Sequence, residues 1–375
     1  MAKKKKFWKS PSAEAAFRGK EDNLRKTLRE IVSGQSRLLH RPDDLYEAIA
    51  NGLDEIEKIK DVKVQLELLA WTLRADFLAF KADDEEMDTW NDLFYDAGTF
   101  FIEVAKTYDD KDYIADLIHD LAVRHVGGEG REVVFLSIED VMPVERAKAL
   151  IVELLGVIDA TELENREDVL DAICDMADAI KDTENFAKAS LYKDPDKSNA
   201  TLIDIANSYF VAGDIAMAKQ WLGDVKDPGA EDEEAFLDLQ AAIADREGRK
   251  TDCLKFATRL YECFPKVMNL SRLCMLKSGS ELDKLLIDHV KYRSTTCDTS
   301  YMMLLANLKK FELLGQYVNH FEKELPAQDA SELNAISDEL ERAGEKELAK
   351  HIREWTVEEP EDAEAFDDRE ERLLR

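Results

Sequence analysis

Two similar segments that follow one another within residues 199–265 constrain the fold of this chain more than any other feature. Each segment contains two apolar-periodic stretches separated by a glycine, and the second segment repeats the first after 35 residues. Gly213 and Gly248 hold equivalent places, where the missing side chain permits a tight turn between two helices. Small residues that would let the helices approach closely recur in the same frame: Ala206 with Ala241, and Ala218 with Cys253. The pattern predicts two consecutive helix hairpins, with Tyr209 and Leu222 buried between the helices of the first.

This spacing resembles the tetratricopeptide repeat, a helix hairpin with a period of about 34 residues. The resemblance implies a right-handed α-solenoid of antiparallel helix hairpins, here over residues 194–357. It also implies that a peptide would bind along the groove lined by the first helix of each hairpin. Carried onto this sequence, the groove residues are Asn207 and Phe210 in one repeat, and Asp238, Asp245 and Arg246 in the next.

The chemistry of these groove positions bears on the kind of ligand that the resemblance implies. Asn207 matches the asparagine of those repeats that hold the C-terminal carboxylate of a peptide. The basic partners of that clamp are replaced, since their positions hold Ile203, Ala235 and Leu239. We therefore do not expect carboxylate capture. A groove that carries Asp238 and Asp245 would favour a basic or mixed-charge ligand.

The remainder of the composition points to an all-α protein. Apolar residues make up 45% of the 375 residues, which suffices for a continuous core, and only 15 glycines and 8 prolines occur. The prolines fall between apolar-periodic segments, where helices begin or end. The best strand candidate, residues 133–136, is short and lies inside a helix-compatible pattern. We expect no significant sheet.

Residues 20–193 are predicted to form an N-terminal region of helical hairpins. The most regular apolar stripes run over residues 62–80 and 87–108, with 3- and 4-residue steps that draw one apolar face along each helix. The short acidic link at residues 83–86 implies that these two helices are antiparallel neighbours. Further helices are expected near residues 20–33, 42–59, 111–125, 131–141, 144–157, 166–181 and 184–192.

The repeat becomes less regular toward the C-terminus. Gly279, Gly315 and Gly344 continue the series of turn glycines at steps of 31, 36 and 29 residues. Arg272 stands where a small residue is expected in the unit that turns at Gly279, so that unit fits the pattern poorly. Residues 358–375 are predicted to form an acidic tail that ends the array.

The net charge of −30 is distributed unevenly along the chain. Residues 1–41 hold 12 Lys/Arg against 4 Asp/Glu, whereas the remaining residues hold 39 against 77. Residues 1–19 are expected to form a flexible basic arm, which contains Lys3, Lys4, Lys5, Lys6 and Lys9. The arm could be a solvated tail, contact nucleic acid, or dock on an acidic surface of this chain or a second copy. The acidic remainder disfavours nucleic acid, because it would repel phosphate.

Candidate chemistry is sparse. Residues 127–131 are glycine-rich and open a helix, so an anion could bind there, but a turn between helices is the simpler expectation. His119 and His125 are six residues apart and lack the i, i+4 spacing of a helical metal pair. Cys253 and Cys263 are assigned to a helix that faces the core, with no feature that would activate a thiolate. We expect no catalytic residue, no metal site and no cofactor.

These observations predict a non-enzymatic scaffold or adaptor that binds another protein or peptide. The turn at Gly130–Glu132 in an all-helical acidic chain looks similar to a set of uncharacterised bacterial helical-repeat proteins, and it implies a bacterial source. Scattered single cysteines suit a reducing cytoplasm, and no apolar run approaches 18 residues, so no membrane span is expected. The alternative is a nucleic-acid-associated regulator that uses the basic arm. The oligomeric state is left open.

Overall fold

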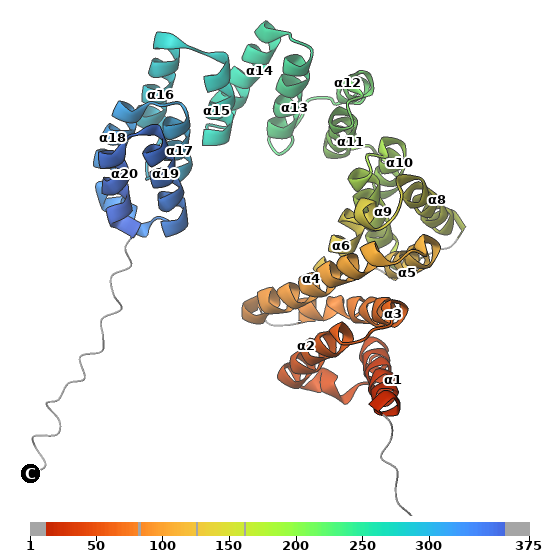
Figure 1. The fold of residues 1–375 in the computed structure, drawn as a ribbon. Helices are drawn as coiled ribbons and strands as arrows, with labels where there is room; N and C mark the ends of the chain where they lie inside the picture. Colours follow the sequence, from red (N-terminus) through yellow and green to blue (C-terminus); the bar gives the residue numbers. More distant parts are fainter. Residues whose placement is uncertain (1–12, 82–83, 125–126, 161–162, 357–375) are drawn as a thin grey trace, which may run out of the picture. The chain divides into compact units, whose positions relative to one another are not determined.

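The computed structural model describes residues 13–81, 84–124, 127–160 and 163–356. The described residues are helical or lie in turns, and none of them forms a strand, so the all-α prediction is confirmed. The chain divides into two compact units, Met1–Asp227 and Pro228–Arg375, which we describe separately (Figure 1). The predicted boundary at residues 193/194 lies within the first unit, between two consecutive helices.

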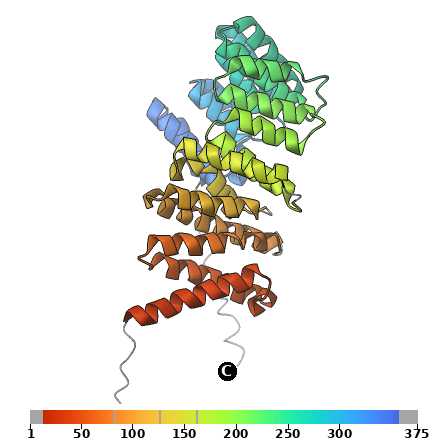
Figure 2. The ribbon, with the colours of Figure 1, turned by 90° about the vertical axis from the view of Figure 1, so that its right-hand side faces the viewer.

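The first unit contains twelve α-helices among its described residues, and short 3₁₀ helices at Arg37–His40 (η1) and Asp76–Lys81 (η2). The α-helices are α1 (Ala13–Val32), α2 (Pro42–Glu57), α3 (Val62–Leu73), α4 (Asp84–Thr107), α5 (Lys111–Val123), α6 (Glu129–Leu136), α7 (Ile138–Val141), α8 (Val144–Ala160), α9 (Arg166–Ala179), α10 (Thr183–Lys193), α11 (Asn199–Val211) and α12 (Ile215–Gly223). Figure 2 shows the helices of this unit lying in successive layers that follow the order of the chain.

The second unit contains eight α-helices among its described residues, with short 3₁₀ helices at Glu322–Ala327 (η3) and Glu354–Thr356 (η4). The α-helices are α13 (Glu233–Arg246), α14 (Lys250–Cys263), α15 (Val267–Leu276), α16 (Gly279–Arg293), α17 (Thr299–Asn307), α18 (Phe311–His320), α19 (Ala330–Ala343) and α20 (Lys346–Arg353). Consecutive helices pack as pairs, α13 on α14, α17 on α18 and α19 on α20 (Figure 1).

Several helices begin at an aspartate whose carboxylate caps the first turn. The side chains of Asp61, Asp110, Asp182 and Asp214 each accept a hydrogen bond from a backbone N–H of the helix that follows. Such a bond satisfies one of the orphaned N–H groups at a helix start, and the negative charge complements the helix dipole. Part of the acidity of this chain therefore serves to define where its helices begin.

The two hairpins that organised the sequence pattern both form. Gly213 and Gly248 adopt positive φ angles of 89° and 71°, the left-handed conformation that glycine accepts without strain. Tyr209 and Leu222 are buried, with exposed fractions of 8% and 7%, so that prediction is confirmed. The first hairpin belongs to the first unit and the second hairpin to the second unit. Stacking of the two hairpins side by side therefore stays a prediction.

Two expectations from the sequence are wrong. Helix α1 begins at Ala13, so the predicted arm of residues 1–19 is helical over its last seven residues. Residues 133–136, the best strand candidate, lie in helix α6, in agreement with the helix-compatible pattern. Gly315 lies within helix α18 and makes no turn, because Lys309 reverses the chain there with a φ of 55°. A non-glycine residue can adopt this conformation at modest cost. The turn therefore contains no glycine by which the sequence could have predicted it.

Two sets of sequence predictions fall outside the described residues. Lys3, Lys4, Lys5, Lys6 and Lys9 precede the first described residue. The acidic tail of residues 358–375 follows the last described residue.

Candidate functional site

The five groove residues predicted from the repeat are divided between the two units. In the first unit Asn207 is exposed on α11 and Phe210 is half-buried. In the second unit Asp238 is half-buried on α13, and Asp245 and Arg246 are exposed at the end of that helix. A single groove that contains all five residues stays a prediction, since each unit is described by itself.

Within the second unit, a groove of about 760 Å³ crosses α13, α15 and α17. These are alternate helices of the chain, and α14 packs against both α13 and α15. We name this feature the methionine groove, and its lining residues are Asp238, Lys266, Val267, Met268, Asn269, Ser271, Arg272, Met275, Asp298, Ser300, Met303, Leu304 and Asn307. Of the predicted groove residues, only Asp238 belongs to it.

Methionine side chains provide the apolar surface of this groove. Met268 and Met275 are 73% and 76% exposed, although both lie on α15 in a well-packed unit. Their separation of seven residues places them on the same face of the helix, two turns apart. Met303 of α17 contributes a third, half-buried methionine. Methionine is flexible and polarizable, and it recurs at surfaces that adapt to peptide partners.

Three of the four charged side chains that line the groove, Asp238, Lys266 and Arg272, form ion pairs with neighbouring side chains. Arg272 of α15 forms an ion pair with Asp238 of α13 at 2.5 Å, and its Nη1 donates to the Asp238 carbonyl oxygen at 2.9 Å. The Lys266 ammonium pairs with Glu234 at 2.7 Å and holds the pKa of that carboxyl below its ordinary value. The Asn269 amide donates to Glu234 at 3.2 Å and to the Phe264 carbonyl oxygen at 2.9 Å.

Arg272 fitted the repeat poorly, and the structure explains why it can stand there. Its guanidinium reaches across to α13 and binds both the side chain and the backbone of Asp238. The pair ties α15 to α13 where a small residue would have allowed close helix contact. It also removes the free negative charge that Asp238 was expected to offer a ligand.

A ladder of polar aromatic side chains lies in the interior of the same unit. The Tyr261 hydroxyl and His289 Nδ1 are 2.7 Å apart, and the Tyr301 hydroxyl donates to the Leu286 carbonyl oxygen at 2.9 Å. The His289 and Tyr301 rings have centroids 4.9 Å apart, and the Tyr301 and Tyr317 rings 5.0 Å. Burial lowers the pKa of His289 and raises the pKa of Tyr301. Their hydroxyl and imidazole groups have hydrogen-bond partners, which indicates a structural role.

In the first unit, the glycine-rich segment holds an anion from the protein itself. The carboxylate of Asp76 in η2 accepts a hydrogen bond from the backbone N–H of Arg131 at 3.2 Å. It also accepts from Arg131 Nε, with both oxygens at 2.9 Å, and from Arg131 Nη2. Burial raises the pKa of Asp76, and the Arg131 guanidinium opposes that rise. The place where a phosphate could have bound is therefore filled by an internal ion pair.

The glycines of this segment allow close packing around that ion pair. A Cβ atom at Gly128 would lie 2.3 Å from the Asp76 carboxyl carbon. A Cβ atom at Gly130 would lie 2.6 Å from the Phe94 carbonyl oxygen, and one at Gly98 would lie 2.5 Å from the Gly130 carbonyl oxygen. These glycines therefore allow α6 to pack closely against α4 and η2, in addition to forming the turn expected from the sequence.

Carboxylates from α6 and α9 face one another in the first unit. Burial raises the pKa of Asp175 to about 7, and the nearby carboxylates of Glu132 and Asp171 add to the rise. Lys193 of α10 pairs with Asp171, and its positive charge opposes the rise in the pKa of Asp175. Among the described residues, no group of His, Cys, Asp or Glu side chains has an arrangement that could hold a metal ion.

The cysteines offer no reactive thiol in the core. Burial raises the pKa of Cys174, Cys274 and Cys297 to about 11 each, and it also raises the pKa of Cys253. The assignment of Cys263 to a core-facing position is wrong, because this residue is exposed at the end of α14. All five cysteines are free.

Comparisons with known proteins leave the chain without an assigned family, since no family model matches it and no curated protein matches it either. Within the part of the chain that the structure describes, no helix is both long enough and apolar enough to cross a membrane. The exposed methionines of α15 are the feature that the sequence reasoning missed. The spacing of two methionines seven residues apart in a helical segment indicates one helix face, but it is equally typical of a face that is buried in the core.

Proposed function

We propose that this protein is a non-enzymatic scaffold that binds a segment of another protein in the methionine groove of its second unit. The observation that carries the proposal is the exposure of Met268 and Met275 on one face of α15, beside Met303 of α17. Exposed large apolar side chains that gather in a groove mark interaction sites more often than chance surface residues do. Their flexibility suits a partner that is itself an extended or helical segment.

The finer architecture belongs to the same proposal. We infer that the helix pairs stack as a right-handed α-solenoid of tetratricopeptide type. Support comes from the pairing of consecutive helices and from a groove lined by alternate helices. In such an array the first helix of each pair lines a concave face, and the proposal assigns α13, α15 and α17 to that position.

The chemistry of the groove favours a partner segment with apolar anchors and mixed charge. Asp238 is neutralised by Arg272, and Lys266 by Glu234, so the groove offers little net charge to a ligand. The exposed hydroxyl and amide groups of Ser300 and Asn307 can form hydrogen bonds with the backbone or polar side chains of a partner. A strongly basic peptide would gain less here than the sequence alone implied. The buried thiols suit a reducing cytoplasm.

The test is affinity capture from a lysate of the source cells with the wild-type chain and two variants. The double variant Met268→Glu/Met275→Glu places two charges in the groove, at exposed positions where folding is not expected to suffer. The control variant, Ile287→Glu, alters an exposed apolar residue of α16 outside the groove. We expect the double variant to lose a protein that the wild type and the control retain.

The same proteins captured by all three chains would contradict this assignment of the groove. Melting temperatures and circular dichroism of the variants exclude loss of folding as the cause. Once the partner is known, the dissociation constant should rise at least about tenfold in the double variant, which corresponds to about 1.4 kcal/mol.

A further inference from the structure

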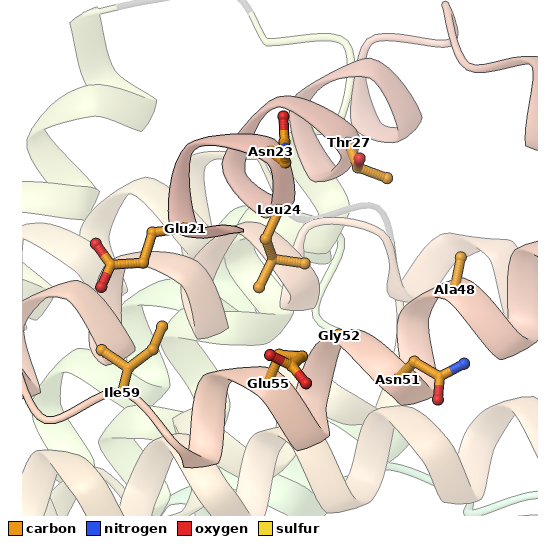
Figure 3. Close-up of a pocket in the computed structure, with 9 residues that line it drawn as sticks. All are labelled: Glu21, Asn23, Leu24, Thr27, Ala48, Asn51, Gly52, Glu55 and Ile59. Carbon is orange, nitrogen blue, oxygen red and sulfur yellow. The ribbon is translucent and has the colours of Figure 1, made fainter. Parts of the chain in front are cut away.

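The first unit contains a hollow of about 400 Å³ between α1 and α2 (Figure 3). Leu24 of α1, Ala48 and Gly52 of α2, and Ile59 after α2 form its apolar walls. Polar side chains, Asn23, Thr27 and Asn51, and two acids, Glu21 and Glu55, complete the lining. Figure 3 shows Leu24 pointing from α1 toward Gly52 of the facing helix.

Sequence explains why the two helices leave space beside one another. Gly52 is buried, and a Cβ atom there would lie 3.2 Å from Leu24 Cδ1, so the helices touch at this point. Around the contact the α2 side of the hollow is lined by Ala48 and Asn51, which are too short to fill the gap. Helix α1 packs on α3 on its other side, through Leu28 in the core and an Arg25–Glu67 ion pair at 3.0 Å. Leu24 is left half-buried, with part of its surface facing the hollow.

The charge around this hollow is strongly one-sided on α2. Helix α2 carries six acidic residues and no Lys, Arg or His: Asp43, Asp44, Glu47, Asp54, Glu55 and Glu57. Two flanking cations pair with it, Arg41 with Asp44 at 2.8 Å and Lys58 with Glu55 at 3.2 Å. An apolar hollow bordered by a helix of this charge would attract a cationic segment and steer its approach.

We propose that this hollow binds a peptide segment of a partner protein in which a large apolar side chain is flanked by lysines or arginines. The apolar side chain would pack against Leu24, Ile59 and Gly52, and its basic neighbours would lie along the acidic face of α2. This site is distinct from the methionine groove, because it lies in the other unit and differs in charge. It therefore stands independently of the function proposed above.

A fluorescein-labelled peptide that contains Lys-Lys-Phe-Trp-Lys, the sequence of residues 5–9, has this chemistry and serves as the probe. Its binding to the full chain is measured by fluorescence anisotropy. We expect saturable binding, with losses of at least about tenfold when Phe-Trp is replaced by Ala-Ala or when the lysines are replaced by glutamates. Equal binding of the Ala-Ala peptide would overturn the proposal, because it would mean non-specific attraction to the acidic surface.

Variants of α2 distinguish binding of the probe inside the hollow from electrostatic attraction to the acidic surface. Asn51→Trp plugs the hollow and leaves the charge unchanged, whereas Glu47→Trp adds the same bulk outside the lining and removes one acid. We expect Asn51→Trp to weaken the probe at least about tenfold and Glu47→Trp no more than about threefold. Thr27→Trp, on the opposite wall, provides a second plug if Asn51→Trp fails to fold. The opposite ranking of plug and control would overturn the proposal.

Two further variants of the protein identify whether the occupant of the hollow comes from a partner or from this chain. The probe should bind the Met268→Glu/Met275→Glu variant as it binds the wild type, so failure of one site does not imply failure of the other. Deletion of residues 2–12, which contain the probe sequence, should leave the affinity unchanged. Binding that appears or tightens at least about tenfold only after the deletion would overturn the partner as occupant and assign the hollow to this chain's own N-terminal segment.

Discussion

The two units use opposite kinds of polar chemistry in their interiors. The first unit buries the Asp76–Arg131 ion pair and holds a half-buried cluster of carboxylates around Asp175. The second unit buries neutral groups, the hydrogen-bonded Tyr261, His289 and Tyr301. An ion pair buried away from water must be completely satisfied, whereas neutral groups tolerate an imperfect partner at lower cost.

The difference between the two interiors coincides with a difference in how regularly consecutive helices pair. In the first unit, η2 and the short helix α6 interrupt the alternation of helix pairs, and the ion pair joins these two irregular elements. In the second unit α13 pairs with α14, α17 with α18 and α19 with α20, and apolar packing with neutral polar contacts suffices. We infer that the buried charge fixes the position of an irregular segment that helix packing alone would not define.

The largest expected effect comes from breaking the buried ion pair. Arg131→Met should lower the free energy of unfolding of the first unit by about 3–5 kcal/mol, because it leaves the Asp76 carboxylate buried without a partner. Pulse-labelled hydrogen exchange across a urea series measures α4 and α6 separately from α17 and α19. The second unit should be unaffected. The matched control is the double variant Asp76→Leu/Arg131→Met, which should recover part of the loss. A loss below about 1 kcal/mol in the single variant would mean that the pair does not fix this segment.

A stabilising change is expected at the carboxylate cluster. The raised pKa of Asp175, about 7, means that its stabilising contribution is complete below about pH 4 and is lost as the pH rises through 7. Asp175→Asn should therefore stabilise the first unit by about 1–3 kcal/mol at pH 8 and by much less at pH 4. Urea unfolding at both pH values tests this difference. Equal effects at the two pH values would contradict the shift.

Removal of one hydroxyl should weaken the neutral ladder of the second unit moderately. Tyr301→Phe leaves the Leu286 carbonyl oxygen without its side-chain donor, although the ring packing is retained. We expect a loss of about 1–2 kcal/mol in the second unit, measured by the same exchange experiment. A loss as large as that of Arg131→Met would remove the distinction between the two interiors.

The smallest effect is expected at His289, with the opposite sign of pH dependence from Asp175. Burial lowers its pKa from 6.5, the nearby Asp298 opposes this change, and Arg293 adds to it. Its contribution to stability is therefore present above pH 6.5 and is lost as the pH falls through the folded-state pKa. His289→Gln should reduce the loss of stability between pH 7 and pH 5 by up to about 1 kcal/mol. An unchanged pH profile in the variant would contradict burial of the imidazole.

Local signals in the sequence predicted the all-α class and most helix positions. Gly213 and Gly248 mark turns that need a left-handed backbone conformation. Tyr209 and Leu222 each belong to the apolar face of a helix, and both are buried. The Asp76–Arg131 pair was not predictable in this way, because its partners are 55 residues apart and neither has a local signature. The chain reversal at Lys309 was not predicted either, because the residue that adopts the positive φ angle there is not a glycine.

The candidate sites were less accessible to sequence reasoning than the fold. Transfer of the repeat frame reached Asp238 but not its partner Arg272, whose length let it bridge to the neighbouring helix. Met268 and Met275 fit an apolar helix face, and only the packing of the unit shows that this face is exposed. Exposure depends on which helix faces are covered by neighbours, and the sequence of one helix does not contain that information.

The most direct test of the methionine groove is NMR of the full chain labelled with [methyl-¹³C]methionine, titrated with the partner that the wild type captures. Single Met→Leu variants assign the signals of the nine methionines. We predict that the signals of Met268, Met275 and Met303 shift or broaden on binding, whereas those of Met142 and Met176, buried in the first unit, stay unchanged. Saturating partner that leaves the three groove signals in place would contradict the proposed function.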